Sequence, residues 1–119
     1  MDINTADMIN RIKASPMYHK MGMIASHLGV VRGSSSDGKP VKGLNIRFDK
    51  DAMDTIIRDT KKMPGIHEIL IEVREGDLDV GQDIMAVVIG GDTRPHVFDA
   101  LIKAVDRIKK EASFKKEVF

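Results

Sequence analysis

Two places in the chain combine residue types that bind or activate an anionic ligand, and the first is a helix start. Thr93 and Arg94 precede Pro95, which suits the first position of a helix, so free backbone amides and an arginine would meet at a helix N-terminus. Such a place binds anions readily. The ordinary interpretation is a capped helix with a solvated arginine, and spacing alone favours it.

The second place is a cluster of lysines near the end of the chain. Lys109 and Lys116 have Lys110, Lys115 and Arg107 as sequence neighbours. Cations at the end of a helix usually complement its dipole and stay in water, and this is again the ordinary interpretation. Crowding by like charges nevertheless favours the neutral form of a lysine, which then serves as a nucleophile or a proton carrier.

The remaining motifs point away from nucleotide, metal and thiol chemistry. Residues 33–39 (GSSSDGK) match seven positions of the P-loop, but Pro40 takes the place of its hydroxyl residue and a strand pattern follows, which predicts a surface loop. The four histidines are scattered, and the acidic stretch 77–83 lacks the frame of a calcium loop. Because the chain has no cysteine either, we expect no metal and no other cofactor.

The composition describes one small globular domain, residues 1–119. The 19 Lys and Arg residues nearly balance the 18 Asp and Glu residues, so no global field suggests nucleic acid or membrane as a partner. One Tyr and four Phe offer little stacking surface for nucleic acid. The N-terminus has no signal-peptide pattern and every apolar run is far too short to span a bilayer, so we expect a cytoplasmic protein.

The helices and strands that position these residues are predicted from the spacing of apolar residues and from capping and turn residues. A short helix capped by Asn4 or Thr5 precedes a strand over residues 21–31, which would form a long-looped hairpin with a second strand over 44–48. A helix capped by Asp49 or Asp51 follows, and then strands over 66–73 and 84–89 on either side of a turn-rich stretch, 74–83.

The last element predicted is the longest helix, which starts after Gly91. Its predicted core stripe comprises Phe98, Leu101, Ile102, Val105 and Ile108. The charged tail after Phe114 is expected to be disordered until a partner or substrate arrives. Hairpins separated by helices favour an α+β fold with helices packed on a mainly antiparallel sheet.

Taken together, several short motifs occur in the order and spacing of a known family. They are residues 29–32 (GVVR), 73–78 (VREGDL) with Gly81, 91–94 (GDTR) followed by 98–100 (FDA), 106–109 (DRIK) and 114–117 (FKKE). In this respect the chain, from Ile3 to Glu117, resembles the large, catalytic subunit of molybdopterin synthase. The resemblance implies the α/β hammerhead fold of that family.

The resemblance also implies a reaction and its partners. The family transfers sulfur from the C-terminal Gly-Gly thiocarboxylate of a small ubiquitin-like subunit to cyclic pyranopterin monophosphate, which forms the molybdopterin dithiolene. The large subunit is a homodimer within a heterotetramer. By position, Lys109 and Lys116 would be the active-site lysines, and Arg32 and Arg94 would bind the substrate phosphate or the developing negative charge.

The chain departs from the family pattern at several of these positions. Thr93 stands where the family has a histidine, and His96 is the candidate to replace that histidine in substrate binding. Lys115 stands where the family has a tryptophan, and His27 where an aromatic residue is usual. The alternative to an active synthase is therefore a catalytically silent paralogue that binds a pterin phosphate or a ubiquitin-like tail.

Overall fold

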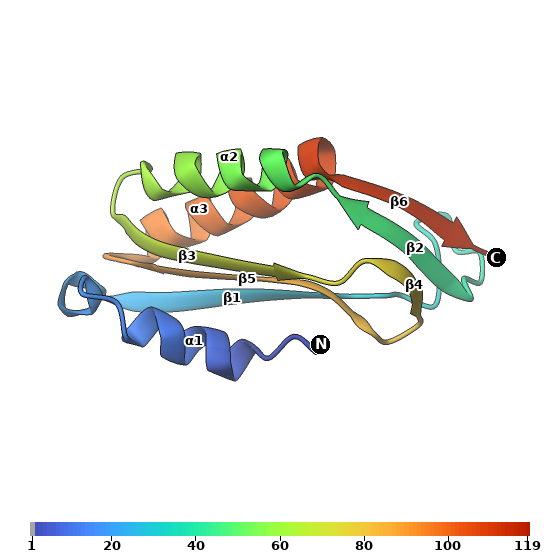
Figure 1. Cartoon of the computed structure of the whole chain (residues 1–119), viewed down its shortest axis with the longest axis horizontal. Helices are drawn as coiled ribbons and strands as arrows, with labels where there is room; N and C mark the ends of the chain where they lie inside the picture. Colours follow the sequence, from blue (N-terminus) through green and yellow to red (C-terminus); the bar gives the residue numbers. More distant parts are fainter. Residues whose placement is uncertain (1) are drawn as a thin grey trace.

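The structure is a computed structural model that describes residues 2–119 (Figure 1). Its helical elements are α1 (Thr5–Lys13), the 3-10 turn η1 (Tyr18–Lys20), α2 (Lys50–Lys61), α3 (Arg94–Arg107) and the π-helical turn η2 (Ile108–Ala112). Its strands are β1 (Met23–Val30), β2 (Gly43–Phe48), β3 (Ile66–Val73), β4 (Gly76–Asp79), β5 (Asp83–Gly91) and β6 (Ser113–Val118).

The first sheet has the strand order β1-β5-β3, and all of its pairings are antiparallel. Helix α1 covers one face, while α2 and α3 cover the other (Figure 1). The central strand β5 is an apolar run because both of its faces are buried: Val87 and Ile89 pack under α2 and α3, and Ala86 and Val88 pack against α1. The predicted α+β class with antiparallel strands is confirmed.

The second sheet has the order β4-β2-β6 and extends beyond the end of the first (Figure 1). The predicted hairpin between the strands at 21–31 and 44–48 is wrong, because β1 pairs with β5 whereas β2 pairs with β4 and β6. The loop between them closes on itself through a bridge between Ser34 and Pro40, and β2 then packs its apolar side on Leu78 of β4. Local alternation identifies a strand but not its partner.

The C-terminal tail is a strand, and the expectation of disorder after Phe114 is wrong. Residues of β6 pair with all six residues of β2, and the Lys42 amide donates to the Val118 carbonyl at 2.6 Å. The turn-rich stretch 74–83 likewise contains the short strand β4. In both cases, β2 forms hydrogen bonds with backbone groups of a charged segment that would otherwise bond to water.

The buried face of α3 is built from small residues and differs from the predicted stripe. Phe98 and Ile102 are 49% and 62% exposed, whereas Val97, Ala100 and Ala104 are buried beside Val105 and Ile108. Small side chains let the helix lie close to the sheet, and a carbon added at Gly91 would approach Val97 to 2.7 Å. The predicted stripe is therefore right at Val105 and Ile108 and wrong at Phe98 and Ile102, because large apolar residues alone do not reveal a buried face made of small ones.

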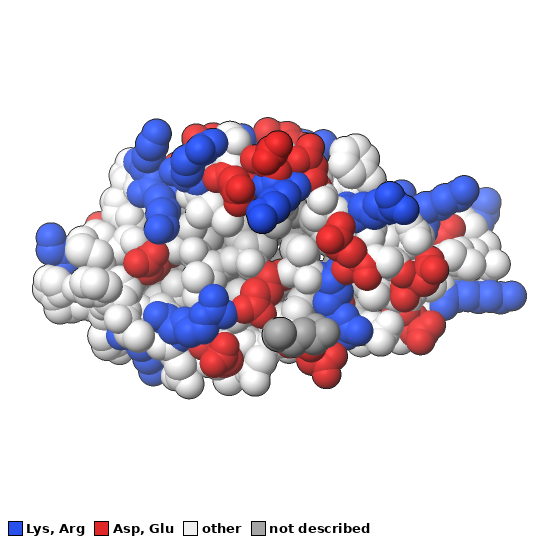
Figure 2. All heavy atoms as spheres, in the orientation of Figure 1, with Lys and Arg blue, Asp and Glu red and all other residues white. Residues whose placement is uncertain are grey.

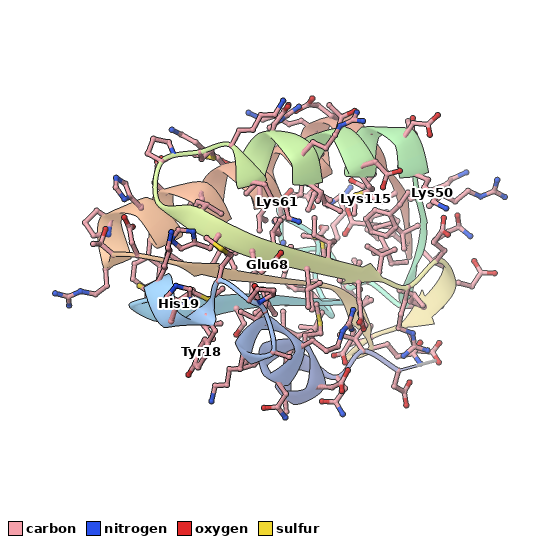
Figure 3. All side chains as sticks on the ribbon, turned by 60° about the vertical axis from the view of Figure 1, so that its left-hand side comes forward. Tyr18, His19, Lys50, Lys61, Glu68 and Lys115 are labelled. Carbon is pink, nitrogen blue, oxygen red and sulfur yellow. The ribbon has the colours of Figure 1, made fainter. Side chains whose placement is uncertain are left out.

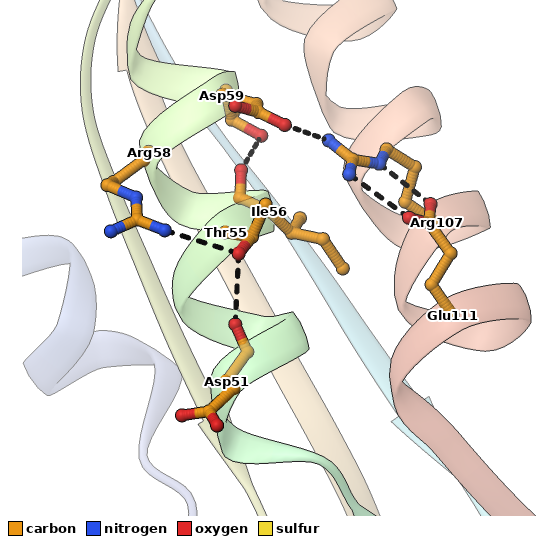
Figure 4. Close-up of polar contacts among 8 residues, drawn as sticks. Asp51, Thr55, Ile56, Arg58, Asp59, Arg107 and Glu111 are labelled. Carbon is orange, nitrogen blue, oxygen red and sulfur yellow. Dashed lines mark hydrogen bonds and ion pairs between the residues drawn. The ribbon is translucent and has the colours of Figure 1, made fainter.

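Ion pairs and caps hold the helices in place around the first sheet. Asn4 and Asp49, two of the residues predicted as caps, cap α1 and α2. Their side chains accept hydrogen bonds from backbone amides. At the end of α3, the Arg107 guanidinium donates to Asp59 of α2 and to Glu111 (Figure 4). Lys61 of α2 reaches Glu68 of β3 at 3.3 Å (Figure 3).

In residues 2–119, no helix is long and apolar enough to cross a membrane.

Candidate functional site

A pocket of about 460 Å³ opens where the end of β1 and the start of β5 meet β2, β6 and η2. The register of the pairing between β1 and β5 shifts between Gly29 and Val30, where β1 reaches this pocket. The apolar part of the lining comprises Val30, Val31, Val41, Leu44, Ile46, Phe48, Ile84, Met85 and Ile108. The polar part comprises His27, Arg32, Ser34, Lys109, Ser113, Lys115 and Glu117.

Arg32 and Lys109, two of the residues predicted from the sequence, line this pocket together. Arg32 follows Val31, whose amide and carbonyl are hydrogen-bonded to Gln82 and Gly81 in the neighbouring turn. Lys109 lies in the π-helical turn η2, where its carbonyl accepts a hydrogen bond from the Ser113 hydroxyl at 3.1 Å. Single π turns in otherwise α-helical segments occur frequently at functional sites.

Strand alternation decides which residues of β6 face the pocket. Lys115 pairs with Ile46 and Glu117 with Leu44, and all four of these residues line the pocket. Lys116 pairs with Asn45 and is not among the lining residues. Because neighbouring residues of a strand point to opposite faces, the structure brings Lys115 to Lys109 and Arg32 in place of Lys116.

The lining of the pocket carries an excess of positive charge. Within the described residues, Arg32, Lys109 and Lys115 take part in none of the ion pairs shorter than 4.0 Å, and Glu117 is the one carboxylate of the lining. Elsewhere, charges of both signs are interspersed on the face shown in Figure 2. Unpaired cations beside apolar walls suit an organic anion such as a phosphate ester or a thiocarboxylate.

His27 also lines the pocket, on the side of β1 that faces α3. Its Nε2 atom is buried and has no hydrogen-bond partner among residues 2–119. Burial lowers the pKa of His27, and the nearby positive charge of Lys109 lowers it further. In the sequence, His27 is recognisable only as a departure from the family pattern, because no motif signals that it borders a pocket.

The three predicted residues at the start of α3 lie elsewhere. Arg94 and Lys109 stand at opposite ends of the continuous helix formed by α3 and η2, about 20 Å apart at a rise of about 1.5 Å per residue. Thr93 is the N-cap residue but makes no side-chain cap. The ring of His96 contacts the Asp92 carboxylate at 2.8 Å, and this hydrogen bond lowers the pKa of Asp92. Within one chain, Thr93, Arg94 and His96 do not reach the pocket.

The loop at residues 33–39 does not have the structure of a P-loop. Strand β2 follows it where a nucleotide site needs a helix, and the Ser35 hydroxyl turns inward to donate to Asp37 and to accept from the Lys39 amide. Likewise, no group of three or more His, Asp or Glu residues in the described part of the chain is placed to hold a metal ion.

Fold and pocket together define a class of small α+β proteins in which two antiparallel sheets meet at a cationic pocket. The family model described as "MoaE protein" matches residues 1–111, and the chain belongs to this family. A protein of Haloferax volcanii described as a probable molybdopterin synthase is 32% identical over 118 residues, a match that covers 92% of this chain. The chain spans 44% of the length of that relative.

Solved structures share the fold at low sequence identity. Molybdopterin synthase from Staphylococcus aureus matches with a TM-score of 0.80 and 20% identity, over 99% of this chain and 86% of that one. A complex of subunits 1 and 2 of molybdopterin-converting factor from Helicobacter pylori contains a chain that matches with a TM-score of 0.71 and 16% identity, over 99% of this chain and 84% of that one. The predicted fold family is thereby confirmed.

Proposed function

We propose that this chain is the catalytic subunit of a molybdopterin synthase. In this reaction, sulfur passes from the thiocarboxylate of a small ubiquitin-like subunit to cyclic pyranopterin monophosphate and forms the dithiolene. The observation that carries the proposal is the pocket lined by Arg32, Lys109 and Lys115 against one carboxylate, Glu117, in a chain of the MoaE family. Both reactants are anions of the kind that such a pocket attracts.

Each cation has a role that follows from its chemistry. Arg32 binds the substrate phosphate, because a guanidinium matches two phosphate oxygens at once. Lys109 and Lys115 stabilise the charge that develops during sulfur transfer and exchange protons with the reacting groups. We assign to Lys115 the role that the resemblance predicted for Lys116, because Lys115 lines the pocket.

The apolar walls of the pocket are compatible with a small partner subunit that enters by its C-terminus. An extended Gly-Gly tail has no side chains and can pass between the apolar walls formed by β2 and by the start of β5. A chain of the same fold from Helicobacter pylori is known in a complex of two subunits, which supports the existence of a partner subunit.

The positions of Arg94 and Thr93 support a homodimer. If Arg94 binds the same substrate as Lys109, about 20 Å away on one chain, it must reach the pocket from a second copy. In that dimer each site would combine the pocket of one subunit with the start of α3 of the other. His96, already held by Asp92, would join the same site.

A silent paralogue that binds the pterin phosphate or the partner's tail is the second candidate. It is favoured by Thr93, which offers no imidazole beside Arg94, and by the engagement of His96 with Asp92. Such a protein would keep the cationic pocket without turnover.

A reconstituted assay separates the two candidates. The full chain is mixed with the thiocarboxylated small subunit from the same source and with the pyranopterin precursor, and dithiolene is read as its oxidised fluorescent derivative. Product that requires both proteins establishes the synthase. Absence of product, with binding of the small subunit shown by calorimetry, would instead support the silent paralogue.

A further inference from the structure

Strand β6 is an outer strand of the second sheet, and one of its edges is open. Its other edge pairs with β2, and no strand among residues 2–119 pairs with the open one (Figure 1). The Asp49 amide donates to the Ala112 carbonyl at 2.8 Å, so every second residue after Ala112 turns its backbone groups toward β2. The alternate residues Lys115 and Glu117 therefore each present an amide and a carbonyl to the open edge.

An open edge of this kind accepts an extended peptide as an additional strand. The edge borders the pocket, because the side chains of Lys115 and Glu117 line it. Opposite residues of an antiparallel pair share a face of the sheet, so a peptide bound here would send every second side chain toward the pocket. Its other side chains would lie on the outer face, where Phe114 is 64% exposed and Val118 is 46% exposed.

The charges along β6 favour one direction for such a peptide. The strand begins at η2, which carries Lys109, and runs past Lys115 to Glu117 at the far end of the second sheet (Figure 1). A chain that ends in a carboxylate or thiocarboxylate is attracted by the two lysines and repelled by Glu117, so its C-terminus belongs at the η2 end. That direction is antiparallel to β6, as are all strand pairings among residues 2–119.

We propose that the small carrier subunit binds by adding the end of its chain to β6 as a fourth, antiparallel strand of this sheet, an inference that rests on the proposed synthase function. The residues before the Gly-Gly end pair with the open backbone groups of Lys115 and Glu117. The Gly-Gly end then passes Ser113 and reaches Lys109, whose carbonyl accepts the Ser113 hydroxyl at 3.1 Å. Backbone pairing supplies affinity, and an apolar side chain beside Phe114 supplies specificity.

Hydrogen exchange measured by NMR on the full chain tests the pairing residue by residue. The small subunit from the same source is added with its unmodified C-terminal carboxylate, so that no reaction follows binding. In the free chain, the amides of Lys115 and Glu117 should exchange quickly, while those of Phe114 and Lys116, which face β2, exchange slowly. The bound small subunit should slow exchange at Lys115 and Glu117 by at least about tenfold.

A spin label tests the direction of the added strand. A nitroxide placed on the small subunit a few residues before its Gly-Gly end should broaden the amide signals of Glu117 and Val118 more than that of Ser113. A parallel strand would give the reverse order, and that result would overturn the proposed direction.

Two substitutions at one position separate the backbone of β6 from its side chain. Glu117→Pro removes the open amide and leaves the pairing with β2, because proline is tolerated where the amide of an edge strand faces outward. Glu117→Ala removes the carboxylate alone. In calorimetry, Glu117→Pro should bind the small subunit about tenfold more weakly than Glu117→Ala, the loss expected for one hydrogen bond.

The outcomes separate the strand pairing from the synthase function. If the small subunit binds while Lys115 and Glu117 stay unprotected, or if both Glu117 variants bind equally, the pairing is overturned and the synthase function stands. If Glu117→Pro does not fold, the exchange pattern of the wild-type chain decides alone. If the small subunit does not bind the wild-type chain, the partnership proposed for the synthase fails, and this inference fails with it.

Discussion

At the scale of single residues, the pocket depends on which side chains point inward. Arg32 and Lys109 come from a loop and from a π-helical turn, while Lys115 is directed inward by its pairing with Ile46. His27 adds a neutral imidazole among these cations. The four residues place a guanidinium, two ammonium groups and an imidazole in the lining of a single cavity.

The free energy of unfolding should depend on the protonation state of His27. Its pKa in the folded protein is below the usual 6.5, so the unfolded chain binds more protons between the two values. The stability associated with neutral His27 is present above pH 6.5 and is lost as pH falls through the lowered pKa. His27→Phe should be more stable than wild type by about 1 kcal/mol at pH 7.5, because it removes an unpaired buried atom.

Urea unfolding followed by circular dichroism at pH 7.5 and 5.5 measures both effects. The gap in unfolding free energy between His27→Phe and wild type should widen at the lower pH. His19→Phe, at an exposed position, is the control for histidine protonation in general. A gap of constant size would mean that the ring of His27 is solvated.

At the scale of elements, α3 positions the site through its small-residue face. Ala100 and Ala104 let the helix approach β5 and β1 closely, and this fixes the direction in which η2 delivers Lys109 to the pocket. Arg107, held by Asp59 and Glu111, secures the end of the helix just before η2 (Figure 4).

A substitution on each side of α3 tests this packing. Ala100→Leu should destabilise the protein by about 2 kcal/mol, because the buried face has no room for a larger side chain. Ile102→Ala, on the exposed face, should change the unfolding free energy by less than about 0.5 kcal/mol. Thermal unfolding monitored by circular dichroism gives both values, and equal effects would contradict the assignment of the two faces.

The sequence predicted the local elements better than their partners. Capping residues and the spacing of apolar residues are local properties, and they predict the helix caps at Asn4 and Asp49 and the strands β1, β2, β3 and β5. The pairing of β2 with β4 and β6 depends on residues far apart in the chain, so the hairpin and the disordered tail were wrong predictions. Lys115 and His27 could be placed at the pocket only once strand pairing was known.

At the scale of the whole molecule, the residues proposed for the site lie at two ends of the chain's fold. The pocket lies where the sheets meet, and Arg94 lies at the far end of α3. If both groups act on one substrate, as we propose, the site is complete only in association with a second copy, and assembly and activity would be coupled.

Mixing two inactive variants tests the shared site. Arg94→Ala and Lys109→Ala should each abolish most activity, yet their mixed dimers should recover about a quarter of the wild-type rate, because half of the dimers then contain one intact site. Lys109→Ala mixed with Lys115→Ala is the matched control, since both residues line the same pocket and no intact site can form. No recovery in the first mixture would place Arg94 outside the site.

The reconstituted assay on two neighbouring lysines tests the central claim most directly. Lys115→Ala and Lys116→Ala remove the same side chain from adjacent positions of β6, one that lines the pocket and one that does not. With the thiocarboxylated small subunit and the pyranopterin precursor, Lys115→Ala should lose about 100-fold in the rate of dithiolene formation, as Lys109→Ala should, while Lys116→Ala stays near wild type. Wild-type rates in Lys109→Ala and Lys115→Ala would show that sulfur transfer does not take place in this pocket.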